Sequence, residues 1–316
     1  MAADTLLPAN RGGARQRHLS TESSDSCSAD DCSFDGDEFH FIESSHAIQV
    51  LSGLDGLRQS RTFCDITLCV DSKEFPCHKI VLASFSPYFN AMFSGELAES
   101  RQEKVTINGI DATMLELLVN YAYTSEVLIT KVNVQSLLSA SNLLEVLPVR
   151  DACCHFMQRN MDETNCLGIH CFAEAHACFN LQEKAKAFTL EFFDDVWPQE
   201  EFVGLSQSKL IELISSDELC VDNEEVVFNA VMRWLNHDEK AHWEELHKVL
   251  EHVRLPLLSP YFLHDCVESQ PIVAKSAECQ KLVEEAKTYH LLQDRRAELR
   301  TSRTRPRKAS GKSTSH

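Results

Sequence analysis

Alternating apolar and polar positions mark residues 63–99 as a compact unit of strands and helices. The apolar side chains of residues 66–70 fall on one face of a predicted strand, and residues 75–77 follow a turn-rich stretch as a second strand. A short apolar helix is predicted over 78–84, and Pro87 takes the first position of another helix. A hairpin closed by two short helices contains no catalytic arrangement, so the pattern favours a protein-binding module.

Helical and strand patterns continue on both sides of this unit. Apolar residues recur at helical spacing over 47–57, which predicts an amphipathic helix. A strand is predicted over 104–107, and Asp111 and Asn133 are each expected to cap a helix. The short apolar piece 127–129 between those two helices is predicted to be an edge strand.

From Pro148 onward the strand signals stop, and the apolar spacing stays near that of a helix. The clearest helix is opened by Asp222, with Glu225 three residues later in an Asp variant of the capping box. A last helix is predicted over 282–289. The sequence has no strict repeat, so we expect a stack of short helices rather than a consensus array.

Composition places the chain among globular proteins of about two domains. It has 316 residues, a mass of 35.7 kDa and 43% hydrophobic residues. No apolar run is long enough to span a bilayer, so no membrane association is expected. The N-terminus lacks the apolar region of a signal peptide, which predicts a cytoplasmic or nuclear protein. Residues 1–38 are Ser-rich and acidic, and we expect them to form a disordered tail.

Charge is distributed unevenly along the chain. The formal net charge of −18 argues against nucleic acid as a partner, because phosphate contacts need a basic face. Basic residues gather over 294–316, where eight basic side chains stand against two acidic ones. We interpret this stretch as a solvated linker. Residues 307–310 also match a basophilic kinase site or part of a nuclear-localisation patch, and both alternatives stay open.

The 13 cysteines are expected to be thiols, because the chain lacks a secretion signal and a CxxC pair. His170, Cys171, His176 and Cys178 suggest zinc, but their spacing does not close a tetrahedral set. We therefore predict core and boundary residues there, and no metal.

Cys77 precedes His78 and Lys79, which would suit a redox-sensitive thiol, but a buried cysteine at a strand end is the favoured interpretation. The sequence has no Gly-rich phosphate loop, nucleophile elbow or HExxH motif. We therefore expect no enzyme activity, no catalytic residues and no cofactor.

Taken together, these motifs resemble the BTB (POZ) domain and the BACK domain of the kelch-like family. The matching pieces are 63–68, 75–83, 86–89, 92–93, 121–124, 165–169, 215–219, 252–258 and 289–292. They form an ordered set that runs from about Ser45 to Arg307, which makes the resemblance specific.

The resemblance implies an α+β BTB/POZ domain, a small sheet with surrounding helices, followed by an all-α helical BACK domain. We place the BTB domain at 39–160 and the BACK domain at 161–292. The basic tail, 293–316, would be the remnant of the linker where kelch repeats begin, and both tails are expected to be disordered.

A homodimer is also implied, formed through the first helix at about 46–58. Leu51 and Leu54 are the expected dimer residues on that helix, and Asp65 with Lys79 would form a buried ion pair near the dimer seam. The resemblance extends this pairing to other kelch-like proteins.

The family docks the scaffold cullin-3 of a ubiquitin ligase through a hydrophobic residue, any residue and a glutamate. Here the signature is Leu97 and Glu99, an apolar anchor beside a group that fixes orientation by a charge-assisted bond. The alternative is a leucine folded inward beside a solvated glutamate. Tyr123, Ile169 and Phe172 are expected to complete the cullin-binding surface.

Family members continue from an Arg-Thr-Arg-Pro-Arg segment, here 303–307, into a kelch propeller that collects the substrate. Too few residues follow that segment here to build a propeller blade. We therefore expect a short or regulatory form of a substrate-adaptor subunit of a cullin-3 ubiquitin ligase, cytoplasmic and either cytoskeleton-associated or partly nuclear. The alternative function is a BTB interaction scaffold for the actin cytoskeleton or for transcriptional repression.

Overall fold

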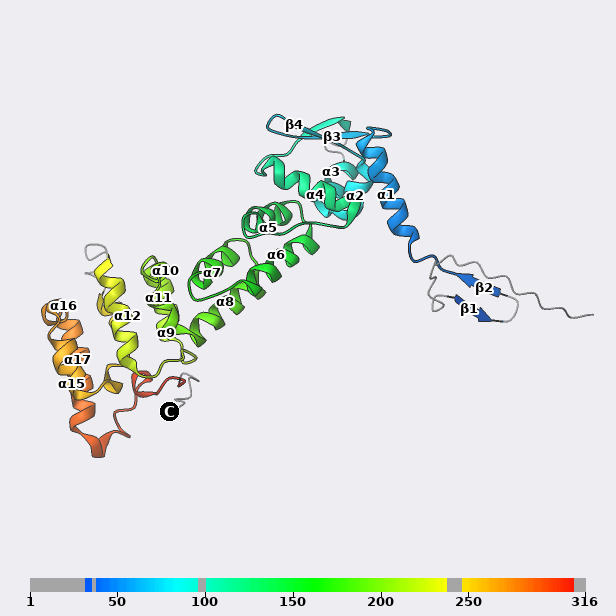
Figure 1. The fold of residues 1–316 in the computed structure, drawn as a ribbon. Helices are drawn as coiled ribbons and strands as arrows, with labels where there is room; N and C mark the ends of the chain where they lie inside the picture. The colour runs from blue at the N-terminus through cyan, green and yellow to red at the C-terminus, as the bar shows by residue number, and fades with distance from the viewer. Residues whose placement is uncertain (1–31, 36–37, 96–100, 238–245, 310–316) are drawn as a thin grey trace, which may run out of the picture. The chain divides into compact units, whose positions relative to one another are not determined.

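The computed structural model describes residues 32–35, 38–95, 101–237 and 246–309 (Figure 1). By its contacts the chain divides into two units, Met1–Gly53 and Leu54–His316, and each is considered by itself. No helix within the described ranges is long and apolar enough to cross a membrane.

The N-terminal unit holds a β-hairpin and the beginning of a helix. β1 (Cys32–Asp35) pairs antiparallel with β2 (Glu38–Phe41), and α1 (His46–Gln59) starts here and continues into the second unit. β1 falls within residues 1–38, for which the sequence predicts no structure. β1 pairs with β2, which follows it closely in the chain, so closing the loop between them costs little conformational entropy. Composition alone does not indicate such a local pairing.

A three-stranded sheet opens the second unit. β3 (Ile66–Val70) lies between β4 (Lys73–Cys77), its antiparallel hairpin partner, and β5 (Lys104–Thr106), which runs parallel to it. Asp71, in the two-residue hairpin connection, has a φ of 52°, a conformation that Asp tolerates better than most residues. The predicted alternation is confirmed, because the apolar side chains of β3 that face the core are at most 2% exposed.

Five helices complete this half of the unit: α2 (Lys79–Phe85), α3 (Pro87–Ser94), α4 (Ala112–Thr124), α5 (Val134–Leu143) and α6 (Leu147–Arg159). The prediction of an edge strand over 127–129 is wrong. The Asn133 side chain bonds this backbone instead: its Oδ1 accepts from Thr130 N at 2.8 Å and its Nδ2 donates to Leu128 O at 2.9 Å. Asn133 occupies the N-cap position of α5, as predicted, but its side chain makes no capping bond and fixes the preceding loop instead.

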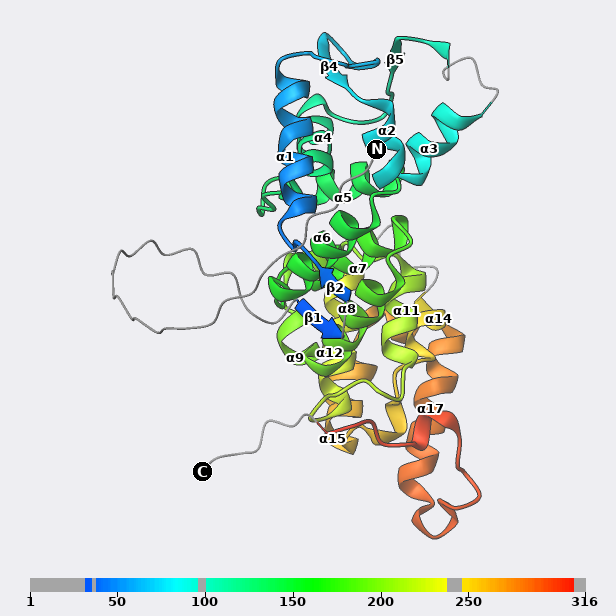
Figure 2. The same cartoon turned by 90° about the vertical axis from the view of Figure 1, so that its right-hand side faces the viewer.

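The regular elements described in the second half of the unit are helices, as predicted, and one isolated bridge joins Cys220 to Lys308 (Figure 2). Its helices are α7 (Cys166–Ala175), α8 (Phe179–Glu191), α9 (Phe193–Val196), α10 (Glu200–Val203), α11 (Gln207–Ser215), α12 (Glu224–His237), α14 (Leu246–Leu250), α15 (Pro260–Phe262), α16 (Pro271–Lys275) and α17 (Ala277–Leu291). A π-helical turn, Leu263–Glu268, follows α15, and 3₁₀ turns lie at Leu255–Leu257, Gln293–Arg295 and Ser302–Thr304.

Two hydrophobic cores divide this unit, and they do not separate at the predicted domain boundary of residue 160. Ile169 and Ala173 of α7, and Leu181 and Ala185 of α8, belong to the core of the sheet half. Cys166, at the start of α7, belongs to the core of the helical half. The α7–α8 hairpin therefore contributes to both cores.

The beginning of α12 differs by one residue from the prediction. The helix starts at Glu224, and Asn223 Oδ1 accepts from Val226 N at 3.2 Å. Asn223 therefore stands in the N-cap position, where its side-chain oxygen satisfies the third N–H of the helix.

The basic stretch after α17 is not a solvated linker over its described residues. Arg303 pairs with Glu285 at 2.6 Å, and Arg307 pairs with Glu224 at 2.8 Å. Val221 N donates to Lys308 O at 3.1 Å. Composition suggests a tail because the acidic partners, Glu285 on α17 and Glu224 on α12, cannot be recognised from the basic run alone.

We predict that Ser86→Ala lowers the free energy of unfolding by about 1–3 kcal/mol. Ser86 is 1% exposed; its hydroxyl accepts from Phe89 N at 3.2 Å as the cap of α3 and donates to Leu144 O at 2.6 Å. Ser206→Ala is the matched control, because Ser206 caps α11 at the surface and should cost about 1 kcal/mol or less. Urea unfolding followed by circular dichroism measures both, and equal losses would contradict the buried bridge.

Candidate functional site

Helix α1 carries apolar side chains that the described residues leave uncovered. None of its 14 residues is buried, and the side chains of Ile48 and Val50 are 71% and 47% exposed. The predicted dimer residues Leu51 and Leu54 are half-buried. An exposed apolar helix of this kind is a surface suited to another protein.

Arg58 fixes the C-terminal end of α1 to α4. Its Nε and Nη2 donate to Asp55 Oδ1 at 2.9 and 2.7 Å, and Nη2 also donates to Asn120 Oδ1 at 2.9 Å. The guanidinium lies over the Tyr123 ring, 4.8 Å from its centroid. Sequence reasoning missed this clamp; the i,i+3 spacing of Asp55 and Arg58 was readable, but their partners on α4 were not.

Below this clamp, His78 and Tyr123 form a buried hydrogen-bond network. The Tyr123 hydroxyl accepts from His78 N at 2.9 Å and lies 3.0 Å from the ring Nδ1, while the ring Nε2 lies 3.0 Å from Thr62 O. Because the hydroxyl already accepts one bond, it can donate to Nδ1, and Nε2–H can donate to Thr62 O. This arrangement satisfies a neutral imidazole, and burial raises the pKa of Tyr123 above its usual value.

The residues predicted to bind cullin do not all lie at the surface. Tyr123 is 1% exposed and Ile169 is 8% exposed, so we reassign both as core residues that support the fold. Phe172 is half-buried on α7, and its ring lies 4.4 Å from that of His176. Of Tyr123, Ile169 and Phe172, Phe172 is therefore the residue that a partner could contact.

The docking signature itself, Leu97 and Glu99, lies outside the described residues. Its position in the chain is two residues beyond Gly95, which ends α3. Both the docking interpretation and the inward-folded alternative therefore remain predictions.

The predicted ion pair of Asp65 and Lys79 takes a different form. Asp65 is exposed, and its Oδ1 accepts from the backbone N of Lys79 at 2.7 Å. The Lys79 Nζ lies 5.7 Å from the centroid of the Phe93 ring. Within one chain Asp65 therefore orients the start of α2 through the backbone, and the pair is not buried.

The candidate cysteine and histidine positions are mostly packing residues. Cys77 ends β4 with its side chain fully buried, and burial raises its pKa to about 12, which confirms the strand-end interpretation. His170 is 5% exposed, whereas Cys171 is exposed on the same helix. Across the described ranges no three His, Cys, Asp or Glu side chains are grouped so that they could hold a metal.

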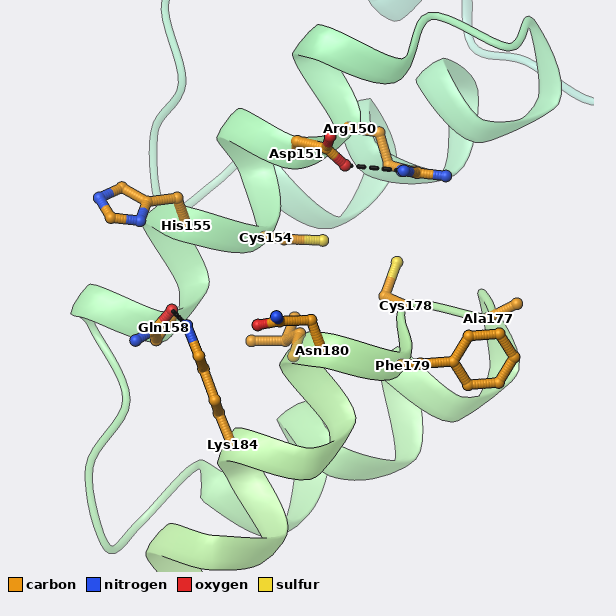
Figure 3. Close-up of a pocket in the computed structure, with 11 residues that line it drawn as sticks. Arg150, Asp151, Cys154, His155, Gln158, Ala177, Cys178, Phe179, Asn180 and Lys184 are labelled. Carbon is orange, nitrogen blue, oxygen red and sulfur yellow. Dashed lines mark hydrogen bonds and ion pairs between the residues drawn. The ribbon is translucent and has the colours of Figure 1, made fainter.

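A groove of about 570 Å³ lies between α6 and α8 (Figure 3). Gln158 Oε1 and Lys184 Nζ are 2.8 Å apart at one end, and the Cys154 and Cys178 side chains point into the gap. Phe179 is 70% exposed at its edge. Burial, together with the neighbouring Cys178, raises the pKa of Cys154 to about 12, so this thiol is protonated near neutral pH.

We predict that Tyr123→Phe lowers the free energy of unfolding by about 1–3 kcal/mol, because it leaves the His78 N–H and ring nitrogen without their partner. Tyr121→Phe, a change in a half-buried residue of the same helix, is the control and should stay within about 0.5 kcal/mol. Thermal and urea unfolding measure both variants. A loss no larger for Tyr123→Phe than for Tyr121→Phe would show that the network contributes little.

Comparison with known proteins places two family models on this chain. Residues 54–161 match the BTB/POZ domain, and residues 166–268 match BACK, described as "BTB And C-terminal Kelch". Among solved structures, the BTB domain of zebrafish PATZ1 is 27% identical, over 39% of this chain and 99% of that chain, with a TM-score of 0.36. The chain therefore belongs with the proteins built from a BTB/POZ domain followed by a BACK domain, the pair that is the hallmark of kelch-like proteins.

Proposed function

We propose that this protein is a homodimeric adaptor subunit of a cullin-3 ubiquitin ligase. The observation that carries the proposal is the pairing of a BTB with a BACK domain, since such proteins are commonly related to cullin-3 ligases. The Leu97 and Glu99 signature follows α3 in the sequence, and Phe172 on α7 supplies an accessible aromatic side chain.

Dimer formation is supported by α1. A second copy of the same helix would cover Ile48 and Val50, which the described part of the chain leaves exposed, and a symmetric pair uses the same surface twice. The half-buried Leu51 and Leu54 extend this surface toward the centre of the helix. Burying these side chains against a partner contributes about 25 cal/mol for each Å² of apolar area.

Cullin-3 would contact the region that begins after α3. An exposed leucine supplies an apolar anchor of the kind that dominates interface energy, and a neighbouring carboxylate orients the partner. Tyr123 and Ile169 would act behind this surface by fixing α4 and α7 within the core.

We predict that the double variant Val50→Asp, Leu51→Asp dissociates the dimer, or weakens it at least tenfold, because each protomer would place two carboxylates in the symmetric interface. Leu291→Asp on α17, where the leucine is 82% exposed, is the control and should leave the dimer intact. Size-exclusion chromatography with light scattering measures the oligomeric state. A wild-type protein that is monomeric at micromolar concentration would sink the dimer proposal.

We predict that Leu97→Ala, Glu99→Ala weakens cullin-3 binding at least tenfold, about 1.4 kcal/mol, in isothermal titration calorimetry. Glu126→Ala, Leu128→Ala is a matched control, since this pair is also a glutamate and a leucine two residues apart, with Leu128 73% exposed. If the Leu97→Ala, Glu99→Ala variant binds cullin-3 with unchanged affinity, these two residues are not the docking site. A chain that dimerises without binding cullin-3 would instead be the BTB interaction scaffold.

A further inference from the structure

The segment Arg303–Lys308, termed here the strap, runs along the helical half of the protein. Its backbone is held at two points: Val221 N donates to Lys308 O at 3.1 Å, and Arg254 Nη1 donates to Arg305 O at 2.6 Å. Cys220 and Lys308 form an isolated parallel bridge. The strap therefore adds an extended piece of chain to a short backbone edge, in the manner of peptides that bind by strand addition.

One side chain of the strap is buried completely. Arg307 Nε and Nη2 donate to the two carboxylate oxygens of Glu224 at 2.8 and 2.9 Å, and both side chains are 2% exposed. Nη1 also donates to Ser216 O at 3.0 Å, and Nη2 to His252 O at 3.1 Å. The planar fork of a guanidinium makes all of these bonds at once, which the single ammonium of a lysine cannot.

Glu224, the carboxylate that accepts from Arg307, is also held by Arg254. Glu224 Oε1 also accepts from the backbone N of Arg254 at 2.8 Å, and the Arg254 side chain, itself buried, pairs with Asp217. A buried carboxylate costs several kcal/mol unless a partner charge compensates it, and Arg307 supplies that charge.

The other charges of the strap are held more loosely. Arg303 and Glu285 are 23% and 34% exposed, and Lys308 and Glu218 are 56% and 64% exposed. Exposed pairs contribute little because water and salt screen them. Of the ion pairs made by Arg303, Arg307 and Lys308, that of Arg307 is therefore the one that is buried on both sides.

We propose that Ser216, Val221, Glu224 and His252 form a receptacle for an extended peptide with a buried arginine, which the chain's own strap fills. Backbone pairing at Val221 gives the peptide its direction, and the Glu224 carboxylate selects arginine over lysine. The receptacle does not depend on cullin binding, since its residues lie on α12 and the loops beside it.

Hydrogen exchange on the full-length protein tests the proposal. In Arg307→Met, exchange at the Val221 amide should rise at least tenfold because its acceptor is Lys308 O of the strap. The adjacent Cys220 amide bonds to Leu190 O at 2.9 Å, outside the strap, and should change by less than about threefold. Lys308→Met removes the exposed neighbouring pair and is the control, with wild-type protection at Val221.

A peptide of residues 301–309, added to the Arg307→Met protein, should restore protection at Val221, whereas the same peptide with lysine in place of Arg307 should not. If Arg307→Met does not fold, Arg307→Lys provides the second variant for both measurements. Equal acceleration at Val221 and Cys220 would mean that the arginine stabilises the whole helical half, and it would overturn the receptacle. If the wild-type peptide at millimolar concentration does not restore protection at the Val221 amide, the receptacle is also ruled out.

Discussion

Helix α7 must bury side chains in two hydrophobic cores at once, and the junction of the two domains depends on this constraint. Cys166 and Leu167 pack into the core of the helical half, whereas Ile169 and Ala173 pack into the core of the sheet half. Between them, Gly168 N donates to Glu201 Oε2 at 2.9 Å, and a Cβ at this position would stand 2.7 Å from Glu201 Oε1. A larger residue here would displace the carboxylate end of the Glu201 side chain, so glycine allows the bond between Gly168 N and Glu201 to form at the boundary of the two cores.

Buried polar groups tie together segments that are distant in the chain. His78 joins the start of α2 to Tyr123 on α4, and Glu224 joins α12 to Arg307. Each group meets its partners in full, which is the condition under which burying a polar group does not destabilise the fold. The pair of Glu224 and Arg307 also fixes the position of the basic C-terminal stretch on the helical half.

Periodicity predicted the sheet hairpin, the first helix and the helical second half, because local spacing decides which face of an element is apolar. It failed where a side chain bonds a neighbouring backbone, as Asn133 does to Leu128, or where a basic run finds acids on remote helices, as Arg307 does. The residues predicted for a dimer lie on a helix without buried residues, and their pairing stays a prediction. Tyr123 was predicted to lie at a surface, whereas its hydroxyl is hydrogen-bonded in the core. Such partners depend on tertiary structure, and no spacing in the sequence encodes them.

The shared core has a consequence for synthesis on the ribosome. Leu181 and Ala185 of α8 fill the core that surrounds the sheet, so the first domain cannot complete its interior when residue 160 has just been made. Some 25 further residues must leave the exit tunnel before those side chains arrive. The core around the sheet is therefore complete only once the first hairpin of the helical half has been made.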